Sequence, residues 1–204
     1  MCECVSERVK ADFGRVDILC NNAGIVVGKP FLDVPDSLAQ KVMDVNTTAH
    51  FWTTKAFLPD MMRRNHGHVV TIASAAGLAG VAGLGDYCAS KFGAVGFAES
   101  LRLELRKQGK TGVATTLVCP FYINTGMFEG VKSAFPLLPL LEPEYVAAQV
   151  VTAMKRNTAV LCLPRMVYVT PLLKGLLPVG LQDWLAEVIG VSNSMDQFKG
   201  RSKL

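Results

Sequence analysis

The chain has 204 residues, of which half are apolar and 19% are charged, so it can bury a sizeable core and does not belong to the disordered or coiled-coil classes. Its 21 Lys and Arg against 17 Asp and Glu leave a formal net charge of +4, and the basic residues are scattered, whereas nucleic-acid binding needs a basic stripe. Six cysteines without a Cys-x-x-Cys pair exclude a dense disulfide scaffold and favour a reducing compartment.

Helical and strand-like patterns alternate in the first third of the chain. Residues 1–12 have the spacing of an amphipathic helix. The apolar run Val16–Cys20 is followed by Asn-Asn-Ala-Gly, which predicts a strand and then a turn. Helices are expected over Asp36–Met43 and Thr47–Arg64, and Pro59 is expected to bend or end the second of them.

The rest of the chain continues this alternation. Strands are predicted over His68–Ile72, Val113–Val118 and Ala159–Leu163. Helices are predicted over Tyr87–Lys107, after a glycine-rich loop at 77–85, and over Pro143–Arg156, which has proline in its first turn. Apolar strands that alternate with helices predict a parallel sheet covered on both faces, which is the doubly wound α/β class.

The apolar stretch Met166–Leu181 is interrupted by Pro171, Gly175 and Pro178 and is too short and broken to span a membrane. It could lie in a membrane interface, cover a pocket as a lid or form a dimer contact. We therefore divide the chain into a catalytic domain, residues 1–165, and an apolar C-terminal extension, residues 166–204. The final Ser202-Lys203-Leu204 matches a peroxisomal address, which gives one alternative for localisation.

Candidate catalytic residues follow the predicted strands, because ligands bind beyond the carboxyl ends of the strands in open α/β sheets. Ser74 follows the second strand, and Tyr87 and Lys91 share one face of the next helix because they are four residues apart. An ammonium near a phenol favours the phenolate and so lowers the tyrosine pKa. A phenol tuned in this way can accept the proton of an alcohol as hydride leaves the adjacent carbon. No cluster of metal ligands accompanies these residues.

The order of these motifs resembles the classical short-chain dehydrogenase/reductase family, with its Rossmann-like sheet. The resemblance covers essentially the whole chain. It rests on Asn21-Asn22-Ala23-Gly24, Asn46, Ser74, Tyr87 with Lys91, and Pro120-x-x-Ile123-x-Thr125.

The resemblance implies a role for each matching residue. Tyr87 would be the general acid/base and Ser74 would position the substrate oxygen. Lys91 would bind the nicotinamide ribose, and Asn46 would hold a water that links Lys91 to a proton relay. The remaining cofactor contacts would come from Asn21, Ala23 and Gly24 on the adenosine side and from Ile123 and Thr125 at the nicotinamide amide. NAD or NADP would be the cofactor.

Longer stretches, such as HFWTTKAFLPDMM and TTLVCPFYINTGMF, look like the 16C branch of that family, which holds retinol dehydrogenases of the epidermal type. This likeness implies oxidation of all-trans-retinol to retinal at endoplasmic reticulum membranes or lipid droplets. A 17β-hydroxysteroid dehydrogenase is the alternative. The Thr47–Arg64 and Tyr87–Lys107 helices would form a homodimer interface. We expect an apolar pocket wall from Phe128, Phe135, Leu137, Leu138, Leu140 and Leu141.

The sequence departs from the family pattern in one respect. The family's Thr-Gly-x-x-x-Gly-x-Gly loop, which cradles the cofactor pyrophosphate, is not found in these 204 residues. Gly77, Gly80, Gly83 and Gly85 precede the catalytic helix and are better interpreted as a flexible wall of the substrate pocket. Three interpretations stay open: a fragment of an active enzyme, an inactive form that pairs with a full-length relative, and an active miniature enzyme.

Overall fold

A computed structural model describes residues 2–131, 135–136, 138–191 and 193–200. Four parallel strands form one sheet in the order β1-β2-β3-β4. The strands are β1 (Ile18–Asn21), β2 (Gly67–Ile72), β3 (Val113–Pro120) and β4 (Val160–Leu163). The register pairs Leu19 with Val69, Val69 with Thr115 and Val118 with Leu161. The predicted α/β class with a parallel sheet is confirmed.

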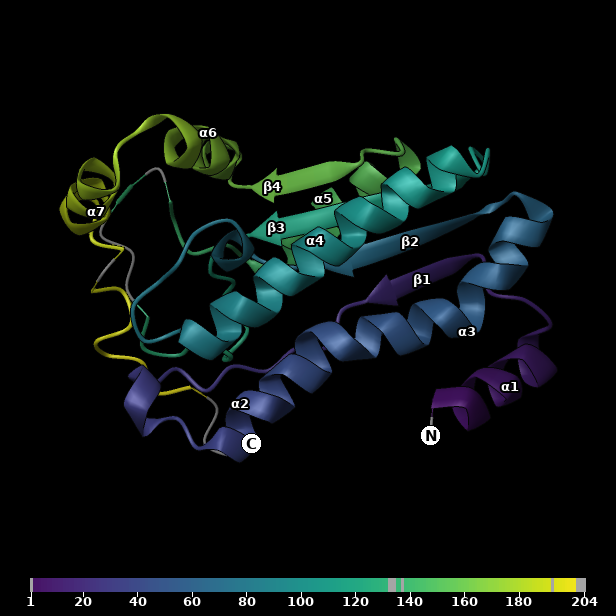
Figure 1. Ribbon diagram of the computed structural model, residues 1–204, viewed down its shortest axis with the longest axis horizontal. Coiled ribbons are helices and arrows are strands. Elements are labelled where there is room, and N and C mark those ends of the chain that lie inside the picture. The colour runs from purple at the N-terminus through teal and green to yellow at the C-terminus, as the bar shows by residue number, and fades with distance from the viewer. Residues whose placement is uncertain (1, 132–134, 137, 192, 201–204) are drawn as a thin grey trace.

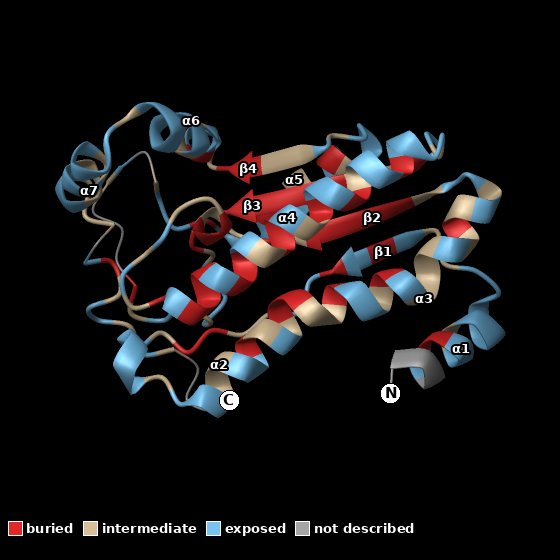
Figure 2. Ribbon diagram, viewed as in Figure 1, coloured by how far each residue is buried: buried red, intermediate tan, exposed pale blue. Residues whose placement is uncertain are grey.

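Helices cover both faces of this sheet, as a doubly wound fold requires (Figure 1). On one face lie α3 (Ala49–Arg64), packed on β1 and β2, and α4 (Gly85–Lys107), packed on β2 and β3. On the other face lies α5 (Pro143–Lys155), packed on β3 and β4. The core therefore consists of the red strand residues in Figure 2 and the helix faces that contact them.

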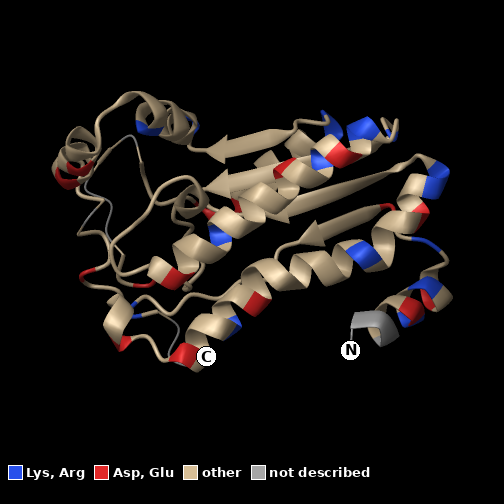
Figure 3. Ribbon diagram, viewed as in Figure 1, with Lys and Arg blue, Asp and Glu red and all other residues tan. Residues whose placement is uncertain are grey.

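The remaining helices lie around this central unit. The first is α1 (Cys2–Phe13), which packs on α3, where Lys10 Nζ donates to the Ala56 carbonyl over 2.7 Å. Near the C-terminus, α6 (Val169–Leu176) and α7 (Val179–Val188) follow β4 and extend beyond the carboxyl ends of the strands (Figure 1). Charges of both signs are spread over several helices, and Figure 3 shows no basic stripe on this side of the molecule.

The helical run that precedes β2 differs from the sequence prediction. The first helix, α2 (Asp36–Met43), has the predicted bounds, but a π-helical turn, η2 (Asp44–Thr48), joins it to α3 without a break. Pro59 lies inside α3, which continues to Arg64. Of the two effects predicted for Pro59, bending or ending the helix, the second is therefore wrong. The helix ends at Asn65, whose φ of 48° lies in the left-handed region that stops a helix.

Smaller differences concern the ends of the strands and the C-terminal segment. β1 extends to Asn21, one residue beyond the prediction, and β3 extends to Pro120 because its end pairs with Leu163 of β4. The broken apolar stretch forms two helices, and the second begins after Pro178. Within the described residues, no helix is both long and apolar enough to cross a membrane. The division of the chain at residue 165 stays a prediction.

Candidate active site

A cavity of about 690 Å³ lies beyond the carboxyl ends of β1, β2 and β3. This is the position at which open parallel sheets bind ligands, and the volume is within the range of small-molecule sites. The opposite wall is formed by α6 and α7, which contribute Leu173, Leu177, Leu185 and Ile189. Mainly apolar side chains line the cavity. Ser74, Tyr87 and Lys91 form a polar group at the strand ends, and α6 and α7 add the polar residues Thr170, Lys174, Gln182 and Asp183 on the opposite wall. A mainly lipophilic molecule with a reactive polar group at the strand ends matches this lining.

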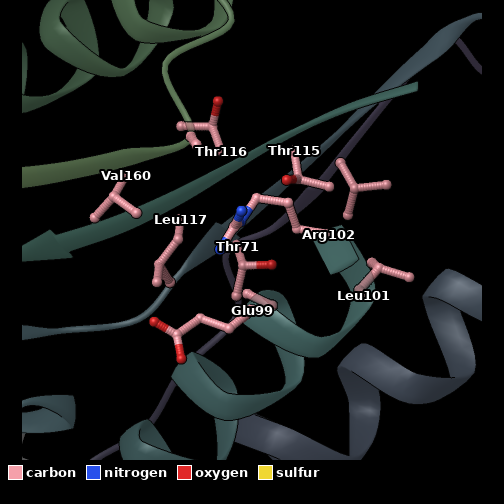
Figure 4. Close-up of a pocket in the computed structure, with 11 residues that line it drawn as sticks. Thr71, Glu99, Leu101, Arg102, Thr115, Thr116, Leu117 and Val160 are labelled. Carbon is pink, nitrogen blue, oxygen red and sulfur yellow. The ribbon is translucent and has the colours of Figure 1, made fainter. Parts of the chain in front are cut away.

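Two other hollows do not have these properties. A groove of about 950 Å³ between α1 and α3 lies beside the start of β1, at the other end of that strand, and charged residues such as Lys10, Lys55 and Asp60 line it. A pocket beneath α4 (Figure 4), where Glu99 and Arg102 lie against Thr71 of the sheet, has a volume of only about 10 Å³. That volume holds at most one water molecule. The cavity at the strand ends is therefore the candidate active site.

Tyr87 and Lys91 extend the buried stripe of α4. Residues 87, 91, 94, 98, 101 and 105 repeat at alternating intervals of four and three, the spacing of a helix face that packs on a core. Ala94 and Ala98 pack on the sheet, and the same face at the start of the helix presents the phenol and the ammonium to the cavity. Tyr87 and Lys91 are therefore buried, with 4% and 3% of their surfaces exposed.

The ammonium of Lys91 is held at the end of β2. Its Nζ donates a hydrogen bond to the carbonyl oxygen of Ile72 over 2.9 Å and lies 5.7 Å from the centre of the Tyr87 ring. Burial lowers the pKa of Lys91 to about 8. Lys91 and Tyr87 are thus neighbours, as the spacing predicts, and a hydrogen bond to β2 holds the charge of Lys91 in place.

The pKa of Tyr87 is raised, which is opposite to the direction expected from the sequence. Burial of the phenol is the largest cause, and hydrogen bonding with Ser74 opposes it. The free-energy cost of removing a phenolate from water exceeds the stabilisation that the nearby polar groups give it, so the neutral phenol is favoured. The four-residue spacing indicated the neighbouring cation correctly, but it carried no information about desolvation.

Ser74 lies beside Tyr87 at the start of a short 3₁₀ helix, η3 (Ala75–Gly77). Its Oγ accepts a hydrogen bond from the Ala76 backbone N–H over 3.1 Å and lies 3.5 Å from the Pro120 carbonyl oxygen. The serine is therefore fixed between the ends of β2 and β3 and faces the same cavity as the phenol.

Asn46 lies in the π-helical turn and is completely buried. Its side-chain oxygen accepts from the Ile25 N–H over 2.8 Å, and its amide nitrogen donates to the Ile25 carbonyl over 2.9 Å and to Ser90 Oγ over 3.0 Å. Ser90 Oγ in turn donates to the Tyr87 carbonyl over 2.7 Å. Asn46 thus joins the loop after β1 to the helix that carries Tyr87.

The loop after β1 contributes Asn22, Ala23 and Gly24 to the cavity. Asn21 differs from the expectation because its side chain points away from the cavity, toward α3. There its Oδ1 accepts from Thr53 Oγ1 over 2.7 Å, and its amide lies 3.4 Å from Thr54 Oγ1. Asn21 is the last residue of β1, so strand alternation places its side chain on the helix-covered face. Asn22 therefore takes its place at the cavity.

Gly24 lies close to Lys91. A Cβ added at Gly24 would lie 3.5 Å from Asn46 Oδ1 and 3.6 Å from Lys91 Nζ, at ordinary contact distances. Across the cavity, Ile123 and Thr125 contribute to the lining from the loop after β3, and Ile123 pairs with Leu141. The ammonium of Lys91 is a hydrogen-bond donor of the kind that ribose hydroxyls accept, so these residues match the chemistry of a nicotinamide cofactor.

The expected apolar wall is only partly correct. Phe128 and Leu138 line the cavity. Leu141 instead packs with Val146 and Leu163 in a separate core cluster, and Leu140 is 39% exposed. Phe135 does not contribute to the lining, and Leu137 lies outside the described residues. The glycine-rich loop does line the cavity, through Gly80 and its neighbours.

The comparisons with known proteins agree with this architecture. A family model described as short chain dehydrogenase matches residues 1–134. The chain is 50% identical to human epidermal retinol dehydrogenase 2 over 200 residues, which are 98% of this chain and 65% of the relative. It is 47% identical to zebrafish (Danio rerio) retinol dehydrogenase 10-B and 46% identical to rat (Rattus norvegicus) retinol dehydrogenase 10, each over 201 residues. Those residues are 97% of this chain and 60% and 59% of these relatives, so the chain spans less than two thirds of their length.

Proposed function

The chain belongs to the short chain dehydrogenase family, and we propose that it acts in the NAD(P)-dependent interconversion of a lipophilic alcohol and its carbonyl compound, with all-trans-retinol and retinal as the pair. One observation carries the proposal: Ser74, Tyr87 and Lys91 meet beyond the strand ends in a mainly apolar cavity of about 690 Å³. The names of the relatives, which are retinol dehydrogenases, support the choice of retinol.

Tyr87 serves as the acid or the base at the reacting oxygen, depending on the direction of the reaction. Burial favours the neutral phenol, which is the form that donates a proton to a carbonyl oxygen. In the oxidative direction Tyr87 accepts the alcohol proton as a phenolate, which the nearby ammonium of Lys91 favours. Ser74 Oγ holds the same substrate oxygen by a hydrogen bond.

NAD or NADP, when bound, supplies the hydride acceptor. Lys91 would hold its ribose beside Gly24, and Ala23, Ile123 and Thr125 would flank it. Asn46 holds the loop after β1 over Lys91, and through Ser90 it fixes the backbone of Tyr87. We also propose that Asn46 binds a water molecule beside Lys91 that belongs to a proton relay.

A lipid surface is the proposed source of the substrate. The outer faces of α6 and α7 expose Leu172, Leu176, Val179, Leu181 and Trp184, and the same two helices form a wall of the cavity. An apolar surface beside the cavity supports docking on the endoplasmic reticulum membrane or a lipid droplet. The peroxisomal alternative rests on Ser202-Lys203-Leu204, which lies outside the described residues.

We further propose a homodimer formed through α3 and α4. Trp52 of α3 and Phe92 and Leu103 of α4 are exposed by 51%, 38% and 57%. Phe92 also carries Lys174 of α6 on its ring, and Trp52 borders the groove between α1 and α3. The exposed apolar area on these two helices supports burial against a second copy. Sedimentation of the wild-type chain and of Trp52→Glu would test this proposal, because a charge at a buried interface should yield monomers.

The catalytic proposal is tested with the purified chain, all-trans-retinol and either NAD or NADP. We expect retinal to form with the wild type and not with Tyr87→Phe, while retinol fluorescence shows that both proteins bind the alcohol. Equal rates for the two proteins, or no retinol binding by the wild type, would overturn the proposal. Preferential oxidation of a 17β-hydroxysteroid would replace retinol by the alternative substrate.

A further inference from the structure

The end of the chain folds back over the wall of the candidate active site. Residues 193–200, here called the strap, run from the end of α7 toward the loop between β1 and α2 (Figure 1). Ser194 is buried, and its Oγ lies 3.1 Å from the hydroxyl of Tyr122. The Lys199 N–H donates to the Glu129 carbonyl over 2.8 Å. The strap is therefore fastened to the loop that follows β3.

Two glycines from separate loops make room for the strap. A Cβ at Gly28 would overlap the ring of Phe198, and one at Gly130 would overlap the carbonyl of Gln197. Both glycines have positive φ angles, 67° and 88°, which side chains rarely adopt. The loop after β2 also contacts the strap, because Gly83 lies beside Met195. The loops after β1 and β3 therefore depend on glycine where the strap packs on them.

The contact with Tyr87 is made through two aromatic rings. Phe198 lies 6.3 Å from Phe128 between ring centres, and Phe128 lies 5.8 Å from Tyr87 in an edge-to-face arrangement with an interplanar angle of 82°. Tyr122 also packs edge-on against Phe128 at 5.0 Å. Phe198 and Met195 join the cluster of Val26, Ala76, Leu84, Tyr87 and Cys88. Phe128 therefore has the strap on one side and Tyr87 on another.

We propose that Phe198 is a positioning residue for Tyr87, acting through Phe128, and that the strap thereby holds the reacting phenol at the substrate oxygen. The proposal rests on the function assigned above to Tyr87. Phe128 lines the cavity and packs against both Tyr87 and Phe198, so removing Phe198 takes away one of the rings that support Phe128. A small displacement of a catalytic group lowers the turnover rate more than the affinity for substrate.

A matched pair of glycine variants tests this contact without altering any aromatic residue. Gly28 and Gly109 have nearly the same φ, 67° and 68°, but Gly28 lies against Phe198 whereas nothing lies within 4 Å of a Cβ at Gly109. Gly28→Ala and Gly109→Ala therefore share the same backbone strain, and only Gly28→Ala displaces the Phe198 ring. The double variant Gly28→Ala with Phe198→Ala removes the overlap, so its effect should be smaller than the sum of the two single effects.

A displacement of the Tyr87 ring would be detected by NMR, from the ring signals of the whole chain labelled with carbon-13 tyrosine. The chain has four tyrosines. Tyr87→Phe assigns the Tyr87 signal by its disappearance. We expect Phe198→Ala and Gly28→Ala to shift the signals of Tyr87 and Tyr122, which contact Phe128, and to leave those of Tyr145 and Tyr168 in place. Gly109→Ala should shift none of the four. Should Phe198→Ala fail to fold, the glycine pair still decides the question.

The kinetics of retinol oxidation distinguish whether Phe198 positions Tyr87 or only supports the fold. Phe198→Ala should lower kcat by about tenfold with little change in KM. An unmoved Tyr87 signal in folded Phe198→Ala, or a moved signal with unchanged kcat, would overturn the positioning role. If the wild type forms no retinal, the proposed function fails, whereas the tyrosine signals still report whether Phe198 determines the position of the phenol.

Discussion

Gly77 lies directly against the backbone of Lys91. A Cβ at residue 77 would be 2.6 Å from the Lys91 carbonyl oxygen and 2.9 Å from Val95 Cγ2. Both neighbours belong to α4, and the first is main chain, which cannot rotate away. The segment after β2 can therefore approach the catalytic helix this closely only because residue 77 is glycine.

Gly77→Ala is expected to push α4 away from the end of β2. Displacing packed backbone costs about 1–3 kcal/mol by analogy with overpacked cores, and it would also lengthen the Lys91–Ile72 hydrogen bond. Urea unfolding would measure the loss. The control is Gly96→Ala on the same helix, where nothing lies within 4 Å and alanine should stabilise by about 0.5–1 kcal/mol. Equal stabilities of the two variants would contradict this explanation of Gly77.

Asn46→Ala should destabilise the loop after β1. The substitution leaves the N–H and the carbonyl of Ile25 without their side-chain partner, and each unsatisfied buried group costs about 1–3 kcal/mol. Hydrogen exchange of the Ile25 amide would show the local effect, and urea unfolding the global one. Asn22→Ala, which alters an exposed asparagine in the same loop, is the control. An Ile25 amide that stays as protected as in the wild type would contradict the assigned role of Asn46.

The sequence predicted the parts of the site that depend on regular periodicity. Tyr87 and Lys91 share a helix face because residues four apart always do, and Ser74, Ile123 and Thr125 follow strands whose apolar runs are easily identified. The resemblance assigned Asn21 to the cofactor by its place in a motif, and a motif does not give the direction of a side chain. Asn21 is still part of β1, so the alternation of the strand places its side chain toward α3.

Other features depended on contacts between distant parts of the chain. For Met166–Leu181 the sequence left a lid over a pocket, a membrane-interface segment and a dimer contact open, and its two helices were not predicted, because Pro171, Gly175 and Pro178 obscure the helical period. The buried environment that raises the pKa of Tyr87 arises from Phe128, Tyr122 and the strap. Their sequence positions alone do not place them beside that ring.

His50 should make the protein less stable in weak acid. This imidazole is 2% exposed, and neither nitrogen has a hydrogen-bond partner among the described residues. Burial, with a smaller contribution from the charge of Lys91, lowers the pKa of His50 to about 4 from the ordinary histidine value of 6.5. The unfolded state therefore binds the proton first, and stability contributed by neutral His50 is lost as the pH falls from 6.5 toward 4.

His50→Leu should remove this acid sensitivity. At pH 7 the leucine variant should be as stable as the wild type or more stable, because it eliminates an unsatisfied buried polar group. The difference in unfolding free energy between variant and wild type should grow between pH 6.5 and 4.5. Because His68 is present in both proteins, its own titration cancels in that difference. A difference that does not depend on pH would show that His50 is protonated equally in both states.

Lys91 produces a pH dependence at the alkaline end of the range. Burial lowers its pKa in the folded protein to about 8 from the ordinary lysine value of 10.5. Between these values the unfolded chain retains the proton that the folded protein has released, so the contribution of Lys91 to the unfolding free energy rises with pH in that window and is lost below pH 8. Lys91→Met should abolish this rise, whereas Lys107→Met, an exposed lysine on the same helix, should retain it. Urea unfolding at pH 7.5, 8.5 and 9.5 measures how steeply the unfolding free energy rises with pH. Tyr87 opposes this rise, because its pKa is raised in the folded protein and the unfolded phenol therefore ionises first. Tyr87 is present in both proteins, so subtracting the unfolding free energy of the variant from that of the wild type removes its contribution. A slope that survives in Lys91→Met would mean that Lys91 keeps its charge when folded.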